Sequence, residues 1–393
     1  MKLIRTAQDL AINGAAPAFE QQLHVGRPNI GNRDAFMKYV GDIFDRRWLT
    51  NNGPVEQAFE QRIADYHQVK HCITMSNGTI ALEIAIRALG MKGEVIVPSF
   101  TFVATAHALH WQAITPVFAD INSVTHTLDP DAVRRMITPC TTGIIGVHLW
   151  GRSVQVEALQ AIADEHGLKL MLDAAPAFGC SHKGTMIGNF GECEVLSFHA
   201  TKFFNTFEGG AVLTNNEELA ETMRLMRNFG FSGLDNVIHP GTNGKMTEIA
   251  AAMGMVNLDS ISDVINANRR NHQTYLEELT DLPGISLLGY DESERNNYQY
   301  VVMEVSAECP VTRDQIVRAL HADNIRVRRY FWPGCHRMKP YRDLYPHAGL
   351  LLPNTQQVAD GIVVLPTGTA MDVDMVRAVC SLIRVLIKND RPV

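Results

Sequence analysis

Short apolar runs alternate with helical patterns over the first half of the chain. The runs are rich in β-branched residues, and the segments between them carry apolar residues three and four positions apart, as one face of a helix does. Strands are predicted at 71–75, 94–98, 115–119, 143–148, 169–173, 194–198 and 211–214, and helices at 80–89, 103–111 and 154–166. This alternation predicts an α/β fold with a mostly parallel wound sheet covered by helices.

The pattern changes after residue 247. One long helix with a polar face is predicted at about 248–279, followed by a strand at 298–305 and by helices at 312–322 and near 372–387. We therefore expect an N-terminal arm at 1–50, a large domain at 51–247 and a small α+β domain at 248–393. The arm is expected to pack on a partner subunit.

Length and composition agree with a two-domain globular protein. The chain has 393 residues, of which 46% are apolar and 20% charged, and a single core rarely grows to this size. No apolar run approaches the ~18 residues that a membrane span needs. The first twenty residues lack the pattern of a secretory signal, so a cytoplasmic location is expected. The seven cysteines are scattered and form no C-x-x-C pair, which favours reduced thiols.

The charge distribution bears on the kind of partner. A formal net charge of -7 opposes non-specific binding to nucleic acid, and the basic stretch at 326–329 is too short to follow a phosphate backbone. His107 and His110 are spaced i, i+3 on a predicted helix, but no third metal ligand of suitable spacing follows. We therefore predict no nucleic-acid partner and no metal site.

Lys202 is the first candidate for chemistry. It follows a predicted strand within Ser-Phe-His-Ala-Thr-Lys at 197–202, and ligands gather at the carboxyl ends of strands in a wound sheet. The phenylalanines at 203, 204 and 207 would lower the lysine pKa by burial, as Schiff-base chemistry requires. On spacing alone, an exposed loop lysine is the commoner interpretation.

Two further segments supply matching parts. Asp173 ends an apolar strand and is placed to face the ring nitrogen of pyridoxal phosphate, although a cap of a helix or turn is the commoner role for such an aspartate. Ser-Asn-Gly-Thr at 76–79 lies where a strand ends and a helix begins, which suits a phosphate cradle or a plain helix cap. Together the three segments are more specific than any one of them.

With these residues identified, nearly the whole chain resembles the sugar-nucleotide aminotransferases of the DegT/DnrJ/EryC1/StrS family. The matching motifs occur in the family's order, at 77–82, 97–105, 147–151, 173–175, 197–202 and 241–246. The resemblance implies the fold type I architecture of aspartate aminotransferase. It also implies pyridoxal 5'-phosphate as cofactor and a homodimer with shared active sites.

The resemblance assigns a role to each matching residue. Lys202 would carry the cofactor as a Schiff base, Asp173 would pair with the ring nitrogen, and Phe102 would stack on the ring. The phosphate would be held by four residues, the last of them from the second subunit: Gly78, Thr79, Ser197 and Asn243. One departure stands out, because Pro176 occupies the position where the family usually has a Gln or His near the cofactor's phenolic oxygen.

The segments at 25–30 and 328–336 resemble members that aminate a dTDP-linked 4-keto-6-deoxyhexose. The expected partners are Arg328, Arg329 and Lys339 for the pyrophosphate, and Tyr330 or His336 for the sugar. We therefore predict transfer of the amino group of L-glutamate to a nucleotide-linked keto sugar, with Lys202 as anchor and proton carrier.

Two alternatives remain open at this stage. Related sugar dehydratases have the same scaffold but a histidine at the position of the Schiff-base lysine, so Lys202 argues against that activity. A non-catalytic regulator or sugar-nucleotide binder could also retain the fold. The sequence does not decide which nucleotide, which sugar epimer or which carbon is involved.

Overall fold

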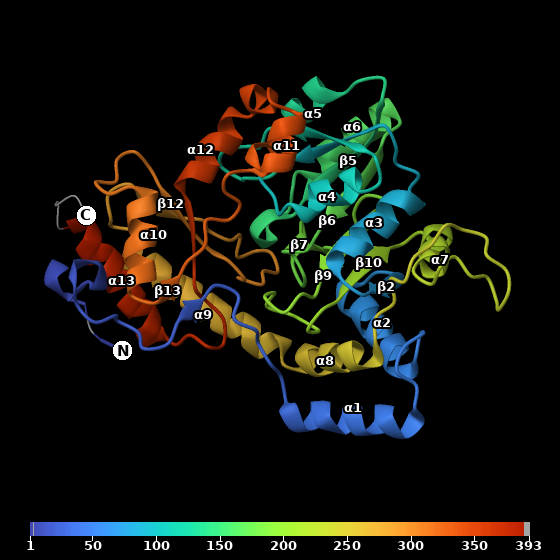
Figure 1. Cartoon of the computed structure of the whole chain (residues 1–393), viewed down its shortest axis with the longest axis horizontal. Coiled ribbons are helices and arrows are strands. Elements are labelled where there is room, and N and C mark those ends of the chain that lie inside the picture. The colour runs from blue at the N-terminus through green and yellow to red at the C-terminus, as the bar shows by residue number, and fades with distance from the viewer. Residues whose placement is uncertain (3, 389–393) are drawn as a thin grey trace.

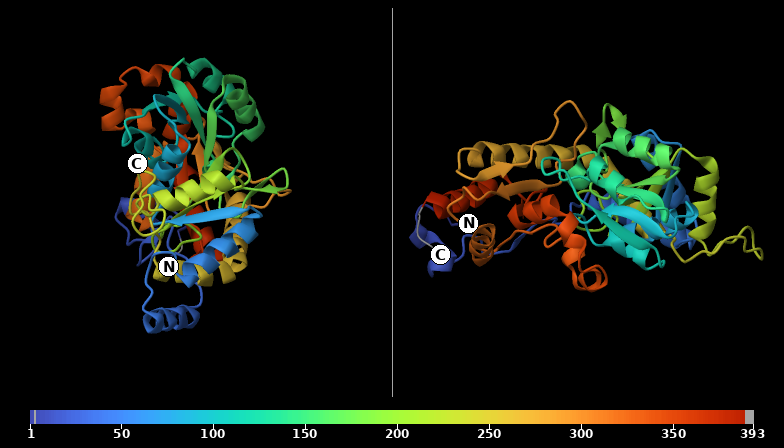
Figure 2. Two further views of the ribbon diagram at one scale, coloured as in Figure 1. Left: turned by 90° about the vertical axis from the view of Figure 1, so that its right-hand side faces the viewer. Right: turned by 90° about the horizontal axis from the view of Figure 1, so that it is seen from above.

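The computed structural model describes residues 1–2 and 4–388, which form two bodies (Figure 1). The larger body, on the right in Figure 1, is built around a seven-stranded sheet, and the smaller body contains the first residues and the last helix. Seen from above, the two bodies lie side by side along the long axis (Figure 2). In the described part of the chain, no helix combines the length and the apolar character needed to cross a bilayer.

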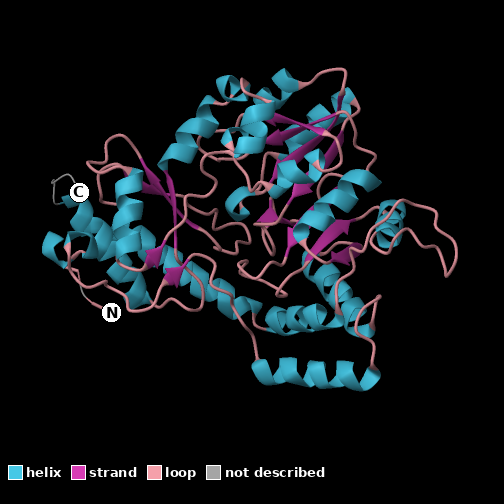
Figure 3. Cartoon of the chain, viewed as in Figure 1, coloured by secondary structure: helices cyan, strands magenta, loops and turns pink. Residues whose placement is uncertain are grey.

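The large sheet has the order β2-β10-β9-β6-β5-β3-β4. Only β10 runs antiparallel to its neighbours, so the sheet is mostly parallel, as predicted. Helices cover both faces of this sheet (Figure 3), so nearly every strand residue is buried. This explains why the strands are nearly continuous apolar runs. The strands are β2 (His71–Met75), β3 (Glu94–Pro98), β4 (Thr115–Ala119), β5 (Thr141–Val147), β6 (Lys169–Asp173), β9 (Cys193–Ser197) and β10 (Gly210–Thr214).

The two faces of the sheet carry different sets of helices. Val95 and Val97 of β3 face a core shared with α3 (Gly78–Ala88), α4 (Ala104–His110) and α7 (Glu217–Met226). Ile96, between those two valines, faces the opposite core with α5 (Pro130–Met136) and α6 (Val156–His166). Successive strand residues point to opposite faces, so each face can bury its own helix layer. The sequence predicted α3, α4 and α6 to within two residues at each end.

The smaller body combines a three-stranded antiparallel sheet with helices. Its strands are β11 (Ile285–Leu287), β12 (Val301–Val305) and β14 (Ile362–Leu365), and its core is shared with α9 (Ile261–Leu279), α10 (Arg313–Ala322) and α13 (Val373–Lys388). Between α10 and β14, the chain passes to the large body and forms α11 (Lys339–Leu344) and α12 (Pro353–Gly361). Tyr341 of α11 packs against Phe118 of the large sheet, so this excursion joins the two bodies.

The N-terminal segment packs against both bodies of its own chain. Leu10, Phe19 and Leu23 are buried in the core of the small body, and β1 (Leu23–His24) pairs in parallel with β13 (Ile325–Arg326). The following helix α1 (Arg33–Arg46) instead lies beside the large body, next to α8 (Glu248–Asp259) (Figure 1). Residues 1–50 therefore contribute to both bodies.

The prediction of one helix over 248–279 is wrong, because the chain forms two helices that meet at Ser260. The backbone of Ser260 leaves the helical region, with φ -99° and ψ 4°. Helix α8 is buried along most of its length against α1 and α2 (Pro54–His67), whereas α9 has a polar face and packs on α13. Helix α8 therefore belongs with the large body, and the start of α9 still packs in the core of that body through Ile261 and Val264.

Glu248 ties α8 to the start of α2. Gly53, which precedes α2, has no side chain to cap the helix, and the buried carboxylate of Glu248 accepts hydrogen bonds from the Val55 and Glu56 amides at 3.2 and 2.7 Å. A side chain at residue 53 would collide with this carboxylate, whose carbon would lie 2.5 Å from the added Cβ. The cap is thus supplied from almost two hundred residues away.

We expect Glu248→Ala to lower the free energy of unfolding in urea by about 2 kcal/mol or more, because two buried amides lose their acceptor. Glu221→Ala is the matched control, since Glu221 is exposed and its carboxylate makes a long contact with Arg224, at 4.0 Å. It should change stability by less than about 0.5 kcal/mol. Equal unfolding midpoints for the two variants would contradict the role of Glu248.

Candidate active site

The carboxyl ends of the central parallel strands meet at a cavity of about 590 Å³ between the two bodies. The loops that follow β2, β3, β5, β6 and β9 all contribute to its lining, as expected for a wound sheet. The small body contributes residues at 299–300 and 328–331, and the N-terminal segment contributes residues 25–26. Among the predicted residues, the cavity is lined by Gly78, Thr79, Phe102, Asp173, Ser197, Lys202, Arg328 and Tyr330.

Lys202 lies in an irregular segment just after β9, with its side chain largely buried in the cavity. Its Nζ donates a hydrogen bond to the hydroxyl of Tyr300 at 3.3 Å. Burial lowers the pKa of the Lys202 amine, and the negative charge of Asp173 opposes that shift. The neighbouring Phe203 and Phe204 are buried, and the ring of Phe204 stacks on Phe178 at 4.3 Å. These rings hold the lysine segment against the large body.

Asp173 is the last residue of β6 and only 6% exposed. One carboxylate oxygen accepts a hydrogen bond from the hydroxyl of Thr105 at 2.8 Å, and the other from the amide of Ala175 at 3.1 Å. Both donors are neutral. Burial raises the pKa of the Asp173 carboxyl, whereas these hydrogen bonds and the charge of Lys202 lower it. A cationic group in the cavity would therefore stabilise the ionised carboxylate.

The start of α3 forms a narrow cradle beside these residues. The side chain of Asn77 caps the helix by accepting from the Ile80 amide at 2.9 Å, and Gly78 and Thr79 line the cavity at the positive end of the helix dipole. A Cβ at Gly78 would lie 3.0 Å from the Cβ of Ser197. Glycine thus keeps open the space between the helix and Ser197.

Phe102 and Tyr330 supply aromatic surface at the mouth of the cavity. Phe102 follows β3 and is 60% exposed, a large fraction for a phenylalanine in a lining loop. Tyr330 lies beside Arg328, whose guanidinium is 4.9 Å from the centre of the tyrosine ring. Burial raises the pKa of the Tyr330 hydroxyl, so this group remains protonated at neutral pH.

Two predicted substrate-binding residues lie outside the lining of the cavity. Arg329 forms an ion pair with Asp314 at 3.0 Å and stacks on Trp332 at 4.3 Å. His336 is 3% exposed, and its Nδ1 lies 2.7 Å from the hydroxyl of Ser99. The segment at 328–336 contains both charged and aromatic residues. Its sequence does not indicate which of these side chains face the cavity.

His336 instead joins the two bodies. Its backbone amide donates to the Ser99 hydroxyl at 3.0 Å, which leaves the hydroxyl proton to be donated to Nδ1. The amide of Cys335 also donates to the Ser99 carbonyl at 2.8 Å. Burial lowers the pKa of His336 to about 4, so the imidazole is neutral at physiological pH. These bonds fix the end of the segment that carries Arg328 and Tyr330.

Asn243 is exposed and does not line the cavity of its own chain. It forms an isolated β-bridge with Asn228, at the base of the extended loop at 228–243 (Figure 1). The predicted contact of Asn243 with a second subunit stays a prediction.

Sequence reasoning missed several lining residues that come from the small body. Gln299 and Tyr300 were included in a predicted strand, but nothing in their local pattern indicated a contact with Lys202, almost one hundred residues earlier. Thr105, the donor to Asp173, was within a matching motif and received no role.

The sequence model of the DegT/DnrJ/EryC1/StrS aminotransferase family matches residues 31–384. The chain belongs to this family. Membership and the arrangement of the two bodies identify the protein as a transaminase with the fold type I architecture, as the sequence predicted.

Relatives and solved structures cover nearly the whole chain. A dTDP-4-amino-4,6-dideoxy-D-glucose transaminase of Shigella dysenteriae is 35% identical, with 93% of this chain and 99% of that protein covered. A GDP-perosamine synthase of Vibrio cholerae is 31% identical, over 88% of this chain and 95% of that protein. The structure of DesI in the presence of its TDP-sugar product shares 45% identity and a TM-score of 0.93, covering 97% of each chain.

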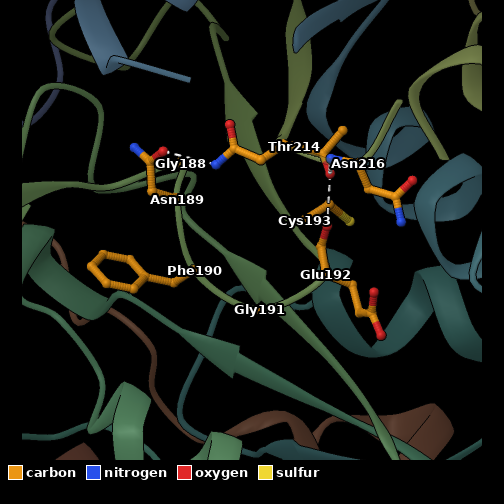
Figure 4. A pocket seen from close by; sticks show the side chains of 9 residues that line it. Gly188, Asn189, Phe190, Gly191, Glu192, Cys193, Thr214 and Asn216 are labelled. Carbon is orange, nitrogen blue, oxygen red and sulfur yellow. Dashed lines mark hydrogen bonds between the residues drawn. The ribbon is translucent and has the colours of Figure 1, made fainter. Parts of the chain in front are cut away.

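A second hollow, of about 340 Å³, lies at the opposite edge of the large sheet, beside the start of β9 and the end of β10 (Figure 4). Its polar groups bond to one another: Asn215 donates to Asn189 at 2.9 Å, and Thr214 donates to the Glu192 carbonyl at 2.8 Å. It contains none of the predicted site residues. In the described residues, no group of three or more His, Cys, Asp or Glu side chains could hold a metal ion.

The Ser99–His336 bond should stabilise the fold. We expect Ser99→Ala to lower the free energy of unfolding by about 1–3 kcal/mol, because the buried Nδ1 of His336 loses its donor. Ser293→Ala is the control, since Ser293 is exposed and bonds only locally to Asp291. Urea unfolding of both variants checks this, and a Ser99→Ala protein as stable as the control would refute it.

Proposed function

We propose that this protein transfers the amino group of L-glutamate to a nucleotide-linked keto-deoxy sugar with the help of pyridoxal 5'-phosphate. The proposed acceptor is dTDP-4-keto-6-deoxyglucose, and the product is the 4-amino-4,6-dideoxy sugar. The observation that carries the proposal is the meeting, in one cavity, of the Lys202 amine, the Asp173 carboxylate and the open start of α3. The cytoplasmic location remains a prediction from the sequence.

The residues present fit this cofactor. An aldehyde needs an amine that can lose its proton, and burial lowers the pKa of Lys202 in that direction. A protonated ring nitrogen needs a carboxylate, and Asp173 is a buried one with only neutral hydrogen-bond donors in contact. A phosphate needs free amides and space. Gly78 and Thr79 provide amides at the start of α3, and the Ser197 side chain borders the space beside them.

When bound, pyridoxal phosphate supplies an aldehyde that condenses with amines. Its ring withdraws electrons from the alpha carbon, which is bonded to the amino nitrogen. Lys202 would hold the cofactor between turnovers and, once displaced by glutamate, would move a proton from the alpha carbon of the donor. Thr105 keeps the Asp173 carboxylate oriented by its hydrogen bond, and Phe102 would cover one face of the ring.

The nucleotide assignment rests on the relatives. The Shigella dysenteriae protein is named for a dTDP-sugar, and DesI, which is 45% identical, was analysed in the presence of its TDP-sugar product. The more distant Vibrio cholerae protein is named for a GDP-sugar. For recognition within this chain, Arg328 and Tyr330 remain as proposed contacts to the pyrophosphate and the sugar, since both line the cavity. Arg329 and His336 are not retained.

We also propose a homodimer in which each active site receives Asn243 from the other subunit. Exposed apolar side chains support a contact surface, because large exposed patches on soluble proteins often mark interfaces. Several of them lie on the extended loop that leads to Asn243: Phe229, Leu234, Val237 and Ile238. Others lie on or just after α1: Met37, Phe44, Trp48 and Leu49.

The first test is the half-reaction with glutamate. Wild-type protein loaded with pyridoxal phosphate should lose the visible absorbance of the bound cofactor when glutamate is added, with release of 2-oxoglutarate. Lys202→Ala should slow overall turnover by about 10³-fold or more, since anchor and proton carrier are both lost. Lys169→Ala, which alters an exposed lysine paired with Glu192, should react like wild type.

Other outcomes would point to the alternatives. If glutamate leaves the absorbance of the wild type unchanged, the transaminase proposal fails. Unchanged biological activity of Lys202→Ala would favour a non-catalytic binder. The substrate is tested with a panel of dTDP-, GDP- and UDP-linked keto sugars and NMR analysis of the products, and amination of only GDP- or UDP-sugars would refute the proposed nucleotide.

The shared active site predicts complementation between subunits. Lys202→Ala and Asn243→Asp should each be impaired at limiting cofactor concentration, the second because its carboxylate repels the phosphate. When equal amounts are unfolded and reassembled together, half of the dimers are mixed, and each mixed dimer has one intact site. Activity should therefore return to about one quarter of that of wild type. If Asn243 acts within its own chain, no activity returns.

A further inference from the structure

Pro176 supplies no polar side chain to the active site. It lies three residues after Asp173, lines the cavity, and has neither a side-chain donor nor a backbone N–H. Its carbonyl oxygen accepts a hydrogen bond from the buried side-chain amide of Asn297 at 2.9 Å, and the same amide donates to the Phe178 carbonyl at 3.1 Å. The small body is therefore fastened to the large body at this position.

The Asn297 contact fixes the segment that follows it. Its side-chain oxygen accepts from the Gln299 amide at 3.0 Å, and the carbonyl of Tyr300 accepts from the Tyr290 hydroxyl at 2.9 Å. The ring of Tyr300 packs edge-on against Trp150, with the ring centres 5.3 Å apart. Tyr300 is 7% exposed, so it can occupy few other positions.

The hydroxyl of Tyr300 points to the reacting nitrogen. It accepts a hydrogen bond from Lys202 Nζ at 3.3 Å, and it lines the same cavity as Pro176 and Asp173. Burial and the negative charge of Asp173 raise the pKa of this hydroxyl, so it keeps its proton at neutral pH. A protonated hydroxyl that accepts from Lys202 still has a proton to donate to another group.

We propose that the Tyr300 hydroxyl donates a hydrogen bond to the phenolic oxygen of the cofactor, replacing the side chain that Pro176 cannot provide. This inference rests on the proposed function. In pyridoxal phosphate, the phenolic oxygen is on the ring carbon next to the one that bears the aldehyde. A donor within hydrogen-bond distance of the amine that condenses with this aldehyde is therefore close to that oxygen.

The proposal has a spectroscopic consequence separate from activity. A donor to the phenolic oxygen stabilises its negative charge, and the oxygen then holds the neighbouring Schiff-base proton less strongly. In the cofactor-loaded protein, Tyr300→Phe should raise the midpoint of the pH titration of the visible absorbance by about one unit or more. Phenylalanine retains the contact with Trp150, and urea unfolding should show that the variant is folded.

Three further variants assign the shift to the hydroxyl. Tyr330→Phe removes another hydroxyl of the same cavity, and Gln299→Leu removes the adjacent amide; both should leave the midpoint within about 0.3 unit of wild type. Pro176→Gln in the Tyr300→Phe background retains the carbonyl that Asn297 binds and restores a donor. This double variant should return the midpoint toward that of wild type.

The outcomes separate this inference from the proposed function. A wild-type protein that loses its visible absorbance with glutamate, but whose midpoint equals that of Tyr300→Phe, would overturn the role of Tyr300 alone. A shift in Gln299→Leu without one in Tyr300→Phe would do the same. A wild-type protein that shows no response to glutamate would overturn the proposed function and this inference together.

Discussion

The site depends on a pair of opposite charges held in one largely buried cavity. A buried carboxyl and a buried amine each tend to lose their charge, and each stabilises the charge of the other. Burial raises the pKa of Asp173 and lowers that of Lys202, while each group opposes the shift of its partner. The pair can thus respond to whatever enters the cavity, since an added cation or aldehyde changes the state of both groups.

The sheet order explains how these two groups meet. β6 ends at Asp173 and pairs directly with β9, which ends five residues before Lys202. The antiparallel β10 returns along β9, and Gly210 leaves room for α3, since a Cβ there would lie 2.7 Å from the Gly78 nitrogen. The cradle at the start of α3 and the charge pair are therefore consequences of one packing arrangement at the carboxyl edge.

The sequence predicted the large body well and the contribution of the small body poorly. Strands such as β2, β3, β4 and β6 have the predicted bounds, because a buried strand is a local pattern of apolar residues. Asp173 and Ser197 are the last residues of β6 and β9, and Gly78 and Lys202 follow β2 and β9, so their convergence could be expected. Which face of the 328–336 segment meets the cavity depends instead on tertiary contacts, such as His336 with Ser99, and no local pattern encodes these.

The break at Ser260 was missed for a related reason. Residues 248–279 are compatible with a continuous helix. The sequence pattern does not distinguish a helix that is buried on most faces from one that is half exposed. Helix α8 is buried against α1 and α2, so its direction is set by its packing on the large body. The direction of α9 is set by its packing on α13 of the small body. Only the positions of the two bodies decide where the direction of the chain changes.

The proposed role of Tyr300 would give the site a polar contact that residue 176 does not supply. A glutamine or histidine at residue 176 would come from the large body, next to Asp173, whereas Tyr300 comes from the small body and is fastened back to Pro176 by Asn297. A hydroxyl can accept from Lys202 and donate at the same time, which a primary amide does through two different atoms. In the proposed arrangement the polar contact comes from the small body, so the chemistry at Lys202 would depend on the contact between the two bodies.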